Sequence, residues 1–104
     1  MAQFDVYENT SPETSRLFPY LLDVQADMLD NLPTRVVVPL VNRAAIRTPI
    51  AVLNPVLEIR HAEVIMLTPQ LVGIQAGLLG TKVCSVKDRR DVIIAALDLI
   101  FTGY

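Results

Sequence analysis

The fold is decided by one apolar stretch near the end of the chain, residues 91–101, which has the sequence DVIIAALDLIF. Ser85 is placed to cap a helix that contains this stretch, and Asp88 follows three residues later as a capping-box partner. Gly103 supplies the residue at which such a helix stops. The pattern therefore predicts a terminal helix that ends close to Phe101.

This helix is apolar around most of its circumference. At about 3.6 residues per turn, only one narrow stripe tolerates water well. The stripe consists of Asp91, Ala95, Asp98 and Thr102. A helix of this kind must be covered by more than one neighbour, so we expect a β-sheet on one side and a second copy of the chain on another.

The chain before the helix is divided into short apolar segments that are typical of strands. These segments are residues 3–7, 20–25, 35–41, 56–60 and 64–68. We expect a turn at 26–32, a long connection with one short helical turn at 42–54, a hairpin turn at 61–63, and a bent strand or bulge within 69–80. Several strands followed by one helix predict a mainly β fold, an antiparallel sheet or small barrel with the helix packed on it.

Two of these segments carry more detailed expectations. In the first, Phe4 and Val6 would face the core while Gln3, Asp5 and Tyr7 face outward, as in a half-buried strand. In the third, Pro39 removes a hydrogen-bond donor from the middle of the segment, which favours an edge position or a bulge.

Length and composition limit the kinds of protein this can be. A chain of 104 residues has room for one hydrophobic core, so we treat residues 1–104 as a single domain. A net charge of −2 disfavours direct nucleic-acid binding. No apolar run reaches the roughly 18 residues of a membrane span, and the start of the chain carries no secretory signal, so we expect a cytoplasmic protein without membrane contact.

Few residues suggest chemistry. His61 and Cys84 are single copies, too few for a metal site or a Cys/His nucleophile pair, and we expect no metal and no cofactor. His61 is interpreted as a turn residue and Cys84 as a small residue in or near the core. Arg35 and Thr68 are residue types that could serve an RNA-cleaving site, although their spacing matches no known motif.

The end of the predicted helix breaks a local electrostatic rule. Asp98 lies near the negative end of the helix dipole, and the Tyr104 carboxylate would add a further charge. One interpretation is an exposed Asp that costs about 0.3–1 kcal/mol and is tolerated. The other is an anionic tip, with Phe101 and Tyr104 as aromatic surface, that suits a basic, Arg-bearing partner.

In the order and spacing of its segments, the chain resembles the CcdB family of plasmid and chromosomal toxins along essentially its whole length. The pieces that carry the resemblance are residues 3–7 (QFDVY), 22–27 (LDVQAD) followed by Asp30, 35–40 (RVVVPL), 66–68 (MLT) and 96–104 (ALDLIFTGY).

The resemblance implies an SH3-like barrel, shared with the MazF-type ribonuclease toxins, and a homodimer formed through the C-terminal helix. It implies an inhibitor without enzymatic activity that inserts the helix ends into the DNA gyrase A subunit, traps the gyrase-cleaved DNA complex and blocks replication. It also implies a role in plasmid maintenance and neutralisation by the flexible C-terminal tail of a CcdA-like antitoxin. The gyrase-binding residues would be Asp98, Phe101, Thr102, Gly103 and Tyr104, together with Met28 and Leu29 in the early turn.

One residue departs from the family pattern. The best-known members carry a Trp that stacks on a gyrase Arg, whereas this chain has Thr102. A cation on an aromatic face contributes about 0.5–2 kcal/mol, so we expect roughly tenfold weaker binding. Two alternatives therefore stay open: a MazF-like endoribonuclease toxin on the same fold, and a CcdB homologue with weak or no toxicity.

Overall fold

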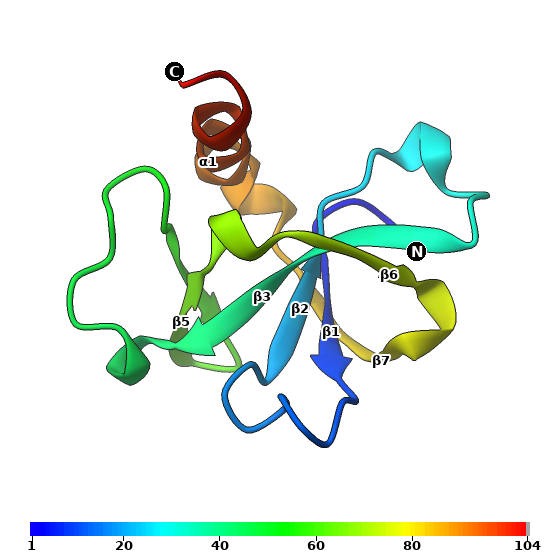
Figure 1. Ribbon diagram of the computed structural model, residues 1–104, viewed down its shortest axis with the longest axis horizontal. Helices are drawn as coiled ribbons and strands as arrows, with labels where there is room; N and C mark the ends of the chain where they lie inside the picture. The colour runs from blue at the N-terminus through cyan, green and yellow to red at the C-terminus, as the bar shows by residue number, and fades with distance from the viewer. Residues whose placement is uncertain (104) are drawn as a thin grey trace.

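The computed structural model describes residues 1–103 and shows a curled antiparallel sheet with one helix packed against it (Figure 1). The strands of the described chain are β1 (Asp5–Asn9), β2 (Tyr20–Asp23), β3 (Thr34–Asn42), β4 (Val56–Ile59), β5 (Ala62–Met66), β6 (Val72–Gln75) and β7 (Leu79–Ser85). Short 3-10 turns lie between them: η1 (Asp27–Leu29), η2 (Arg43–Ala45), η3 (Thr68–Gln70), η4 (Ala76–Leu78) and η5 (Lys87–Arg89). The helix α1 (Arg90–Thr102) comes last, so the expected mainly β class with a C-terminal helix is confirmed.

The strands form one sheet in the order β4-β5-β3-β2-β1-β7, and β6 also pairs with β3. Every pairing is antiparallel. Strand β3 is nine residues long and is shared by β2, β5 and β6, so it forms the centre of the sheet. The sheet curls into a half-barrel, with β6 and β7 joined through η4 at one side (Figure 1).

The strand that contains Pro39 is central, so the expectation of an edge position or a bulge is wrong. On one flank Pro39 lies opposite Leu21. On the other flank β3 pairs with β6 as far as Val37 and with β5 from Leu40, which leaves Pro39 between the two partners. The Pro39 carbonyl accepts a hydrogen bond from the Leu67 N–H at 3.0 Å on that flank. The N and C=O of one strand residue point to the same side, so the Pro39 nitrogen, which has no hydrogen to donate, also faces this flank. The ladder of β3 is already interrupted there, so no strand-pairing hydrogen bond is lost.

Strand β1 is buried on both faces rather than one. Phe4 and Val6 lie in the core as expected, but Asp5 and Tyr7 are also buried, while Gln3 and the last two residues of β1 stay partly exposed. The strand begins at Asp5 because Phe4 has a φ of 72°, outside the extended region. The prediction that Asp5 and Tyr7 face outward is therefore wrong. The curl of the sheet covers this face, and the alternation of polar and apolar residues does not reveal the curl.

The β4–β5 hairpin is present, but its turn lies earlier than residues 61–63. Ile59 pairs with Ala62, so the turn consists of Arg60 and His61, with φ values of 52° and 66°. Positive φ at both central residues is the geometry that matches the twist of a tight hairpin. His61 is an exposed turn residue, as expected.

The glycine-containing segment 69–80 forms η3, β6, η4 and the start of β7, rather than one bent strand. Gly80 permits a close approach between β7 and β1. A Cβ atom at this position would lie 2.8 Å from the Glu8 carbonyl oxygen and 2.9 Å from the Thr10 Cγ2. The small residue therefore reflects packing of the two strands.

The entry into α1 also differs from the expected capping box. Ser85 is the last residue of β7, and its Oγ accepts a hydrogen bond from the Lys87 N–H at 3.3 Å, so it supports η5. The N-cap residue of α1 is Arg89, which makes no side-chain cap hydrogen bond. The 3-10 turn thus leads the chain directly into the helix.

The helix is attached to the sheet through two fully buried residues, Ile93 and Ala96. They join a hydrophobic core that includes Val6, Leu22, Val38, Leu40, Leu57, Ile59, Val64 and Met66. Within residues 1–103, no helix combines the length and apolar character needed to cross a bilayer.

Candidate functional site

The C-terminal end of α1 points away from the sheet (Figure 1). Gly103 has a φ of 80°, and its N–H donates a hydrogen bond to the Leu99 carbonyl at 3.0 Å. This left-handed conformation suits glycine, so the expected helix stop is confirmed. The Thr102 Oγ1 donates to the Asp98 carbonyl at 2.6 Å and closes the last turn.

Four of the residues expected at the helix tip are brought together there. Asp98, Phe101, Thr102 and Gly103 are all exposed, and the exposed fraction of Phe101 is 68%. An aromatic ring that lies mostly in solvent beside a carboxylate is a typical element of a binding surface. The fifth expected residue, Tyr104, lies outside the described residues.

A second apolar surface lies along the side of α1. Val92 is exposed and lines a mostly apolar hollow of about 270 Å³ together with Ala95, Pro55, the exposed Val52 and one charged residue, Arg89. The hollow separates the helix from the loop that precedes β4. The sheet thus covers only one side of α1 within a single chain, which leaves apolar surface available for a partner.

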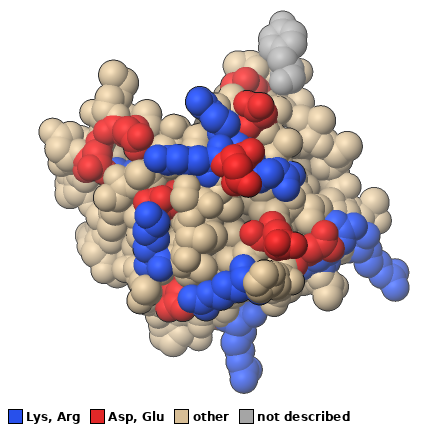
Figure 2. All heavy atoms as spheres, turned by 180° about the vertical axis from the view of Figure 1, so that it is seen from behind, with Lys and Arg blue, Asp and Glu red and all other residues tan. Residues whose placement is uncertain are grey.

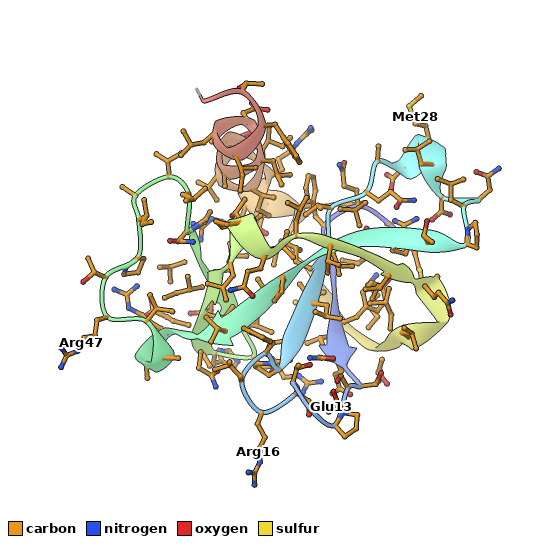
Figure 3. All side chains as sticks on the ribbon, viewed as in Figure 1. Glu13, Arg16, Met28 and Arg47 are labelled. Atoms are coloured by element: carbon orange, nitrogen blue, oxygen red, sulfur yellow. The ribbon has the colours of Figure 1, made fainter. Side chains whose placement is uncertain are left out.

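The early turn presents two further expected residues. Met28 and Leu29, both in η1, have exposed fractions of 87% and 46%, so both side chains are accessible to a partner. The Met28 side chain points outward from the turn (Figure 3). Figure 1 shows η1 and the end of α1 as two separate projections, so a single chain does not bring these residues to the helix tip.

Polar side chains fasten this turn to the sheet. Gln25 Nε2 donates to the Leu29 carbonyl at 2.8 Å, and Gln25 Oε1 accepts from the Val36 N–H at 3.0 Å. Asp27 Oδ1 accepts from the Gln3 N–H at 2.7 Å. The turn is therefore linked both to β3 and to the segment that precedes β1.

A buried arginine completes these links. Arg35 is 1% exposed; its Nε donates to Asp23 Oδ2 at 2.9 Å, and its Nη2 lies 2.6 Å from the same oxygen. Its Nη1 donates to Asp30 Oδ1 at 2.9 Å, just beyond η1. Burial raises the pKa of Asp23, while the hydrogen bonds from Arg35 and from the Gln25 N–H oppose that shift. The cluster was not predicted from the sequence. Its signal there was weak: a charged residue near the end of each of two apolar strands, Asp23 in β2 and Arg35 in β3.

The family model for the CcdB protein matches residues 3–103. The chain belongs to the CcdB family. Members of this family are toxins of toxin–antitoxin systems and typically gyrase poisons. The match includes both η1 and the described end of α1, so these two exposed surfaces lie within the part that the family shares.

The CcdB chain does not assemble Arg35 and Thr68 into an RNA-cleaving site. Thr68 is fully buried, and its Oγ1 donates to the Leu53 carbonyl at 2.6 Å. Arg35 is enclosed with two carboxylates. Neither side chain can reach a phosphate in solvent, so the pair considered from the sequence supports no phosphoryl chemistry.

Other reactive groups of this CcdB are scattered. Cys84 is partly buried, and its burial raises the pKa of the thiol, which lowers its reactivity. Among the described residues, no three His, Cys, Asp or Glu side chains gather as metal ligands would. On the face drawn in Figure 2, basic and acidic side chains alternate, so this face carries no continuous basic track for a phosphate backbone.

Proposed function

We propose that this CcdB protein is a cytoplasmic, non-enzymatic toxin that binds the DNA gyrase A subunit and traps the gyrase-cleaved DNA complex, which blocks replication. It acts as a homodimer and is neutralised by the flexible tail of a CcdA-like antitoxin. The observation that carries the proposal is the tip of α1, where Phe101 is 68% exposed beside Asp98 in a chain of this family.

The chemistry of the tip favours a basic partner surface. Asp98 supplies a carboxylate at the negative end of the helix dipole, which attracts an Arg or Lys from another protein. Fully burying a Phe side chain contributes about 1.5–3 kcal/mol. Because Phe101 is largely exposed, most of this free energy becomes available on binding.

The side of α1 supports the homodimer. Val92, Ala95 and Val52 leave an apolar hollow that the sheet does not cover. A second copy placed here would bury this surface and set two helix tips side by side, matching the two-fold symmetry of a dimeric target. Sedimentation of the purified chain tests this: Val92→Lys should yield monomers, whereas Arg47→Ala in the exposed loop (Figure 3) should leave the dimer unchanged.

Binding to a purified gyrase A fragment tests the site. We expect the intact chain to bind, a chain lacking residues 102–104 to lose binding while it remains a folded dimer, and Phe101→Ala to weaken binding. The matched control is Leu17→Ala, because Leu17 is another large apolar residue with a comparable exposed fraction of 53% but lies between β1 and β2. Equal binding by the intact and shortened chains would remove the proposed site.

An activity assay separates the proposal from its alternatives. The purified protein should cause cleaved plasmid to accumulate only when gyrase is present, and it should leave RNA intact. Degradation of RNA by the protein alone would establish the MazF-like alternative instead. Growth of cells that express the chain, with ordinary or altered gyrase A, identifies a homologue without toxicity, since neither strain would then be affected.

A further inference from the structure

The turn η1 displays apolar side chains without hydrophobic packing to hold it. Met28 is 87% exposed and Leu29 is 46% exposed, and none of the three residues of η1 is buried. The N-cap of this turn makes no side-chain hydrogen bond. A short 3-10 turn with so little packing is intrinsically weak, so its conformation depends on contacts with the rest of the fold.

Those contacts are polar. Gln3 and Gln25 hydrogen-bond to the turn itself, and Arg35 reaches its exit from the interior of the sheet. The Arg35 guanidinium is held on one side by Asp23, which is fully buried in β2. On its other side it donates from Nη1 to Asp30, whose side chain is 50% exposed and directly follows η1. Arg35 therefore connects a rigid position in the sheet with the exit of the turn.

We propose that Arg35 is a positioning residue that, through Asp30, holds η1 in the conformation that presents Met28 to the gyrase A subunit. The inference rests on the proposed function and adds η1 to the tip of α1 as a contact surface for gyrase. The planar guanidinium can bind two carboxylates at once, which a lysine ammonium on a flexible stem does less well. A turn ordered before binding loses less conformational entropy when the complex forms.

The test uses Asp30→Ala, which cuts the tether at its exposed end and leaves the buried Asp23–Arg35 pair intact. We expect this variant to bind the gyrase A fragment roughly tenfold more weakly than the unaltered chain. Arg35→Lys should weaken binding in the same direction. The amino terminus also lies 4.0 Å from the same Asp30 oxygen. Because Arg35→Lys changes the guanidinium and leaves the amino terminus in place, it shows which of the two partners of Asp30 matters.

A double-mutant cycle distinguishes positioning from direct contact. If Asp30 acts only by ordering the turn, Asp30→Ala should cost no further affinity in a chain that already carries Met28→Ala. If the losses of gyrase affinity caused by Asp30→Ala and by Met28→Ala add in full in the double variant, the inference is overturned, but the proposed function is not. The matched control is Glu63→Ala, which breaks an exposed ion pair with Arg43 at 3.8 Å on a different part of the sheet and should leave binding unchanged.

Amide hydrogen exchange supplies a readout that needs no gyrase. The Leu29 N–H donates to the Ala26 carbonyl at 2.9 Å, and the Asp30 N–H donates to the Asp27 carbonyl at 3.0 Å. We expect both amides to exchange faster in Asp30→Ala and to keep their rates in Glu63→Ala. Unchanged exchange in Asp30→Ala overturns the inference. Failure of the unaltered chain to bind gyrase would overturn the proposed function, a distinguishable result.

Discussion

The guanidinium of Arg35 donates a hydrogen bond to the carboxylate of Asp30 over 2.9 Å and so links the inside of the sheet to its surface. The same guanidinium is paired with Asp23, a fully buried carboxylate on the neighbouring strand. A charge inside a protein is tolerated only when it is paired and hydrogen-bonded. The cluster therefore connects a buried position in the sheet with the exit of the early turn.

Removal of the buried cation should destabilise the fold strongly. Arg35→Met leaves the Asp23 carboxylate buried and unpaired, so we expect the free energy of unfolding in urea to fall by about 3–5 kcal/mol. Replacing both partners, as in Arg35→Met with Asp23→Leu, should recover part of this loss because no orphaned charge then remains. A double variant no more stable than the single one would contradict this account.

Tyr7 should make the fold sensitive to alkali. Burial, together with the nearby carboxylates of Asp5 and Asp23, raises the pKa of Tyr7 from 10.0 to about 12. Below pH 10 both the folded and the unfolded chain hold the proton, and stability is unaffected. Between about pH 10 and 12 only the unfolded chain loses it, so the free energy of unfolding should fall as the pH rises.

Ultraviolet absorbance of tyrosinate checks this assignment. The folded protein should show a late tyrosinate step near pH 12, and this step should disappear in Tyr7→Phe. In denaturant, where the tyrosines are solvated, the late step should be absent even in the unaltered chain. A single ordinary titration of the folded protein would show that the Tyr7 hydroxyl is not shielded.

The glycines provide a paired test of strand packing. Gly80→Ala places a methyl group 2.8 Å from the Glu8 carbonyl oxygen, so we expect it to lower the free energy of unfolding by about 1–3 kcal/mol. Gly73→Ala is the control, because a Cβ at Gly73 meets no heavy atom within 4 Å. Equal effects in chemical denaturation would mean that the close approach of β7 to β1 is not real.

An aromatic residue at the helix tip should strengthen gyrase binding. Thr102 is exposed, and its hydroxyl donates to the Asp98 carbonyl one turn earlier, so the position accepts a larger side chain. If an Arg of gyrase faces it, Thr102→Trp should gain about 0.5–2 kcal/mol, which is roughly 2- to 30-fold in affinity for the gyrase A fragment. Thr102→Leu adds apolar surface without a ring, and equal gains from Trp and Leu would exclude stacking.

Local pattern was a good guide wherever a segment is governed by its own periodicity. The strands around Val6, Leu22 and Val38 and the terminal helix with its Gly103 stop all lie close to their expected ranges. Helix amphipathicity and glycine at a left-handed cap depend on neighbours in sequence, which is why they could be predicted.

Local pattern failed where distant segments meet. Pro39 occupies a central strand because β5 and β6 share one flank of β3 and leave a gap at that residue. Asp5 and Tyr7 are buried because the sheet curls over its second face. Ser85 completes a strand rather than capping the helix, since pairing of β7 with β1 continues to that residue.

A mainly β chain with one apolar terminal helix could be predicted from the sequence alone, because hydrophobic periodicity is encoded residue by residue. The resemblance of the chain to the CcdB family could also be recognised from the sequence, and the family match confirms it. Only the tertiary structure decided that Asp23, Arg35 and Asp30 form one cluster and that η1 and the tip of α1 stand apart. Such contacts depend on how strands far apart in the chain pair and curl, and a one-dimensional pattern does not specify this.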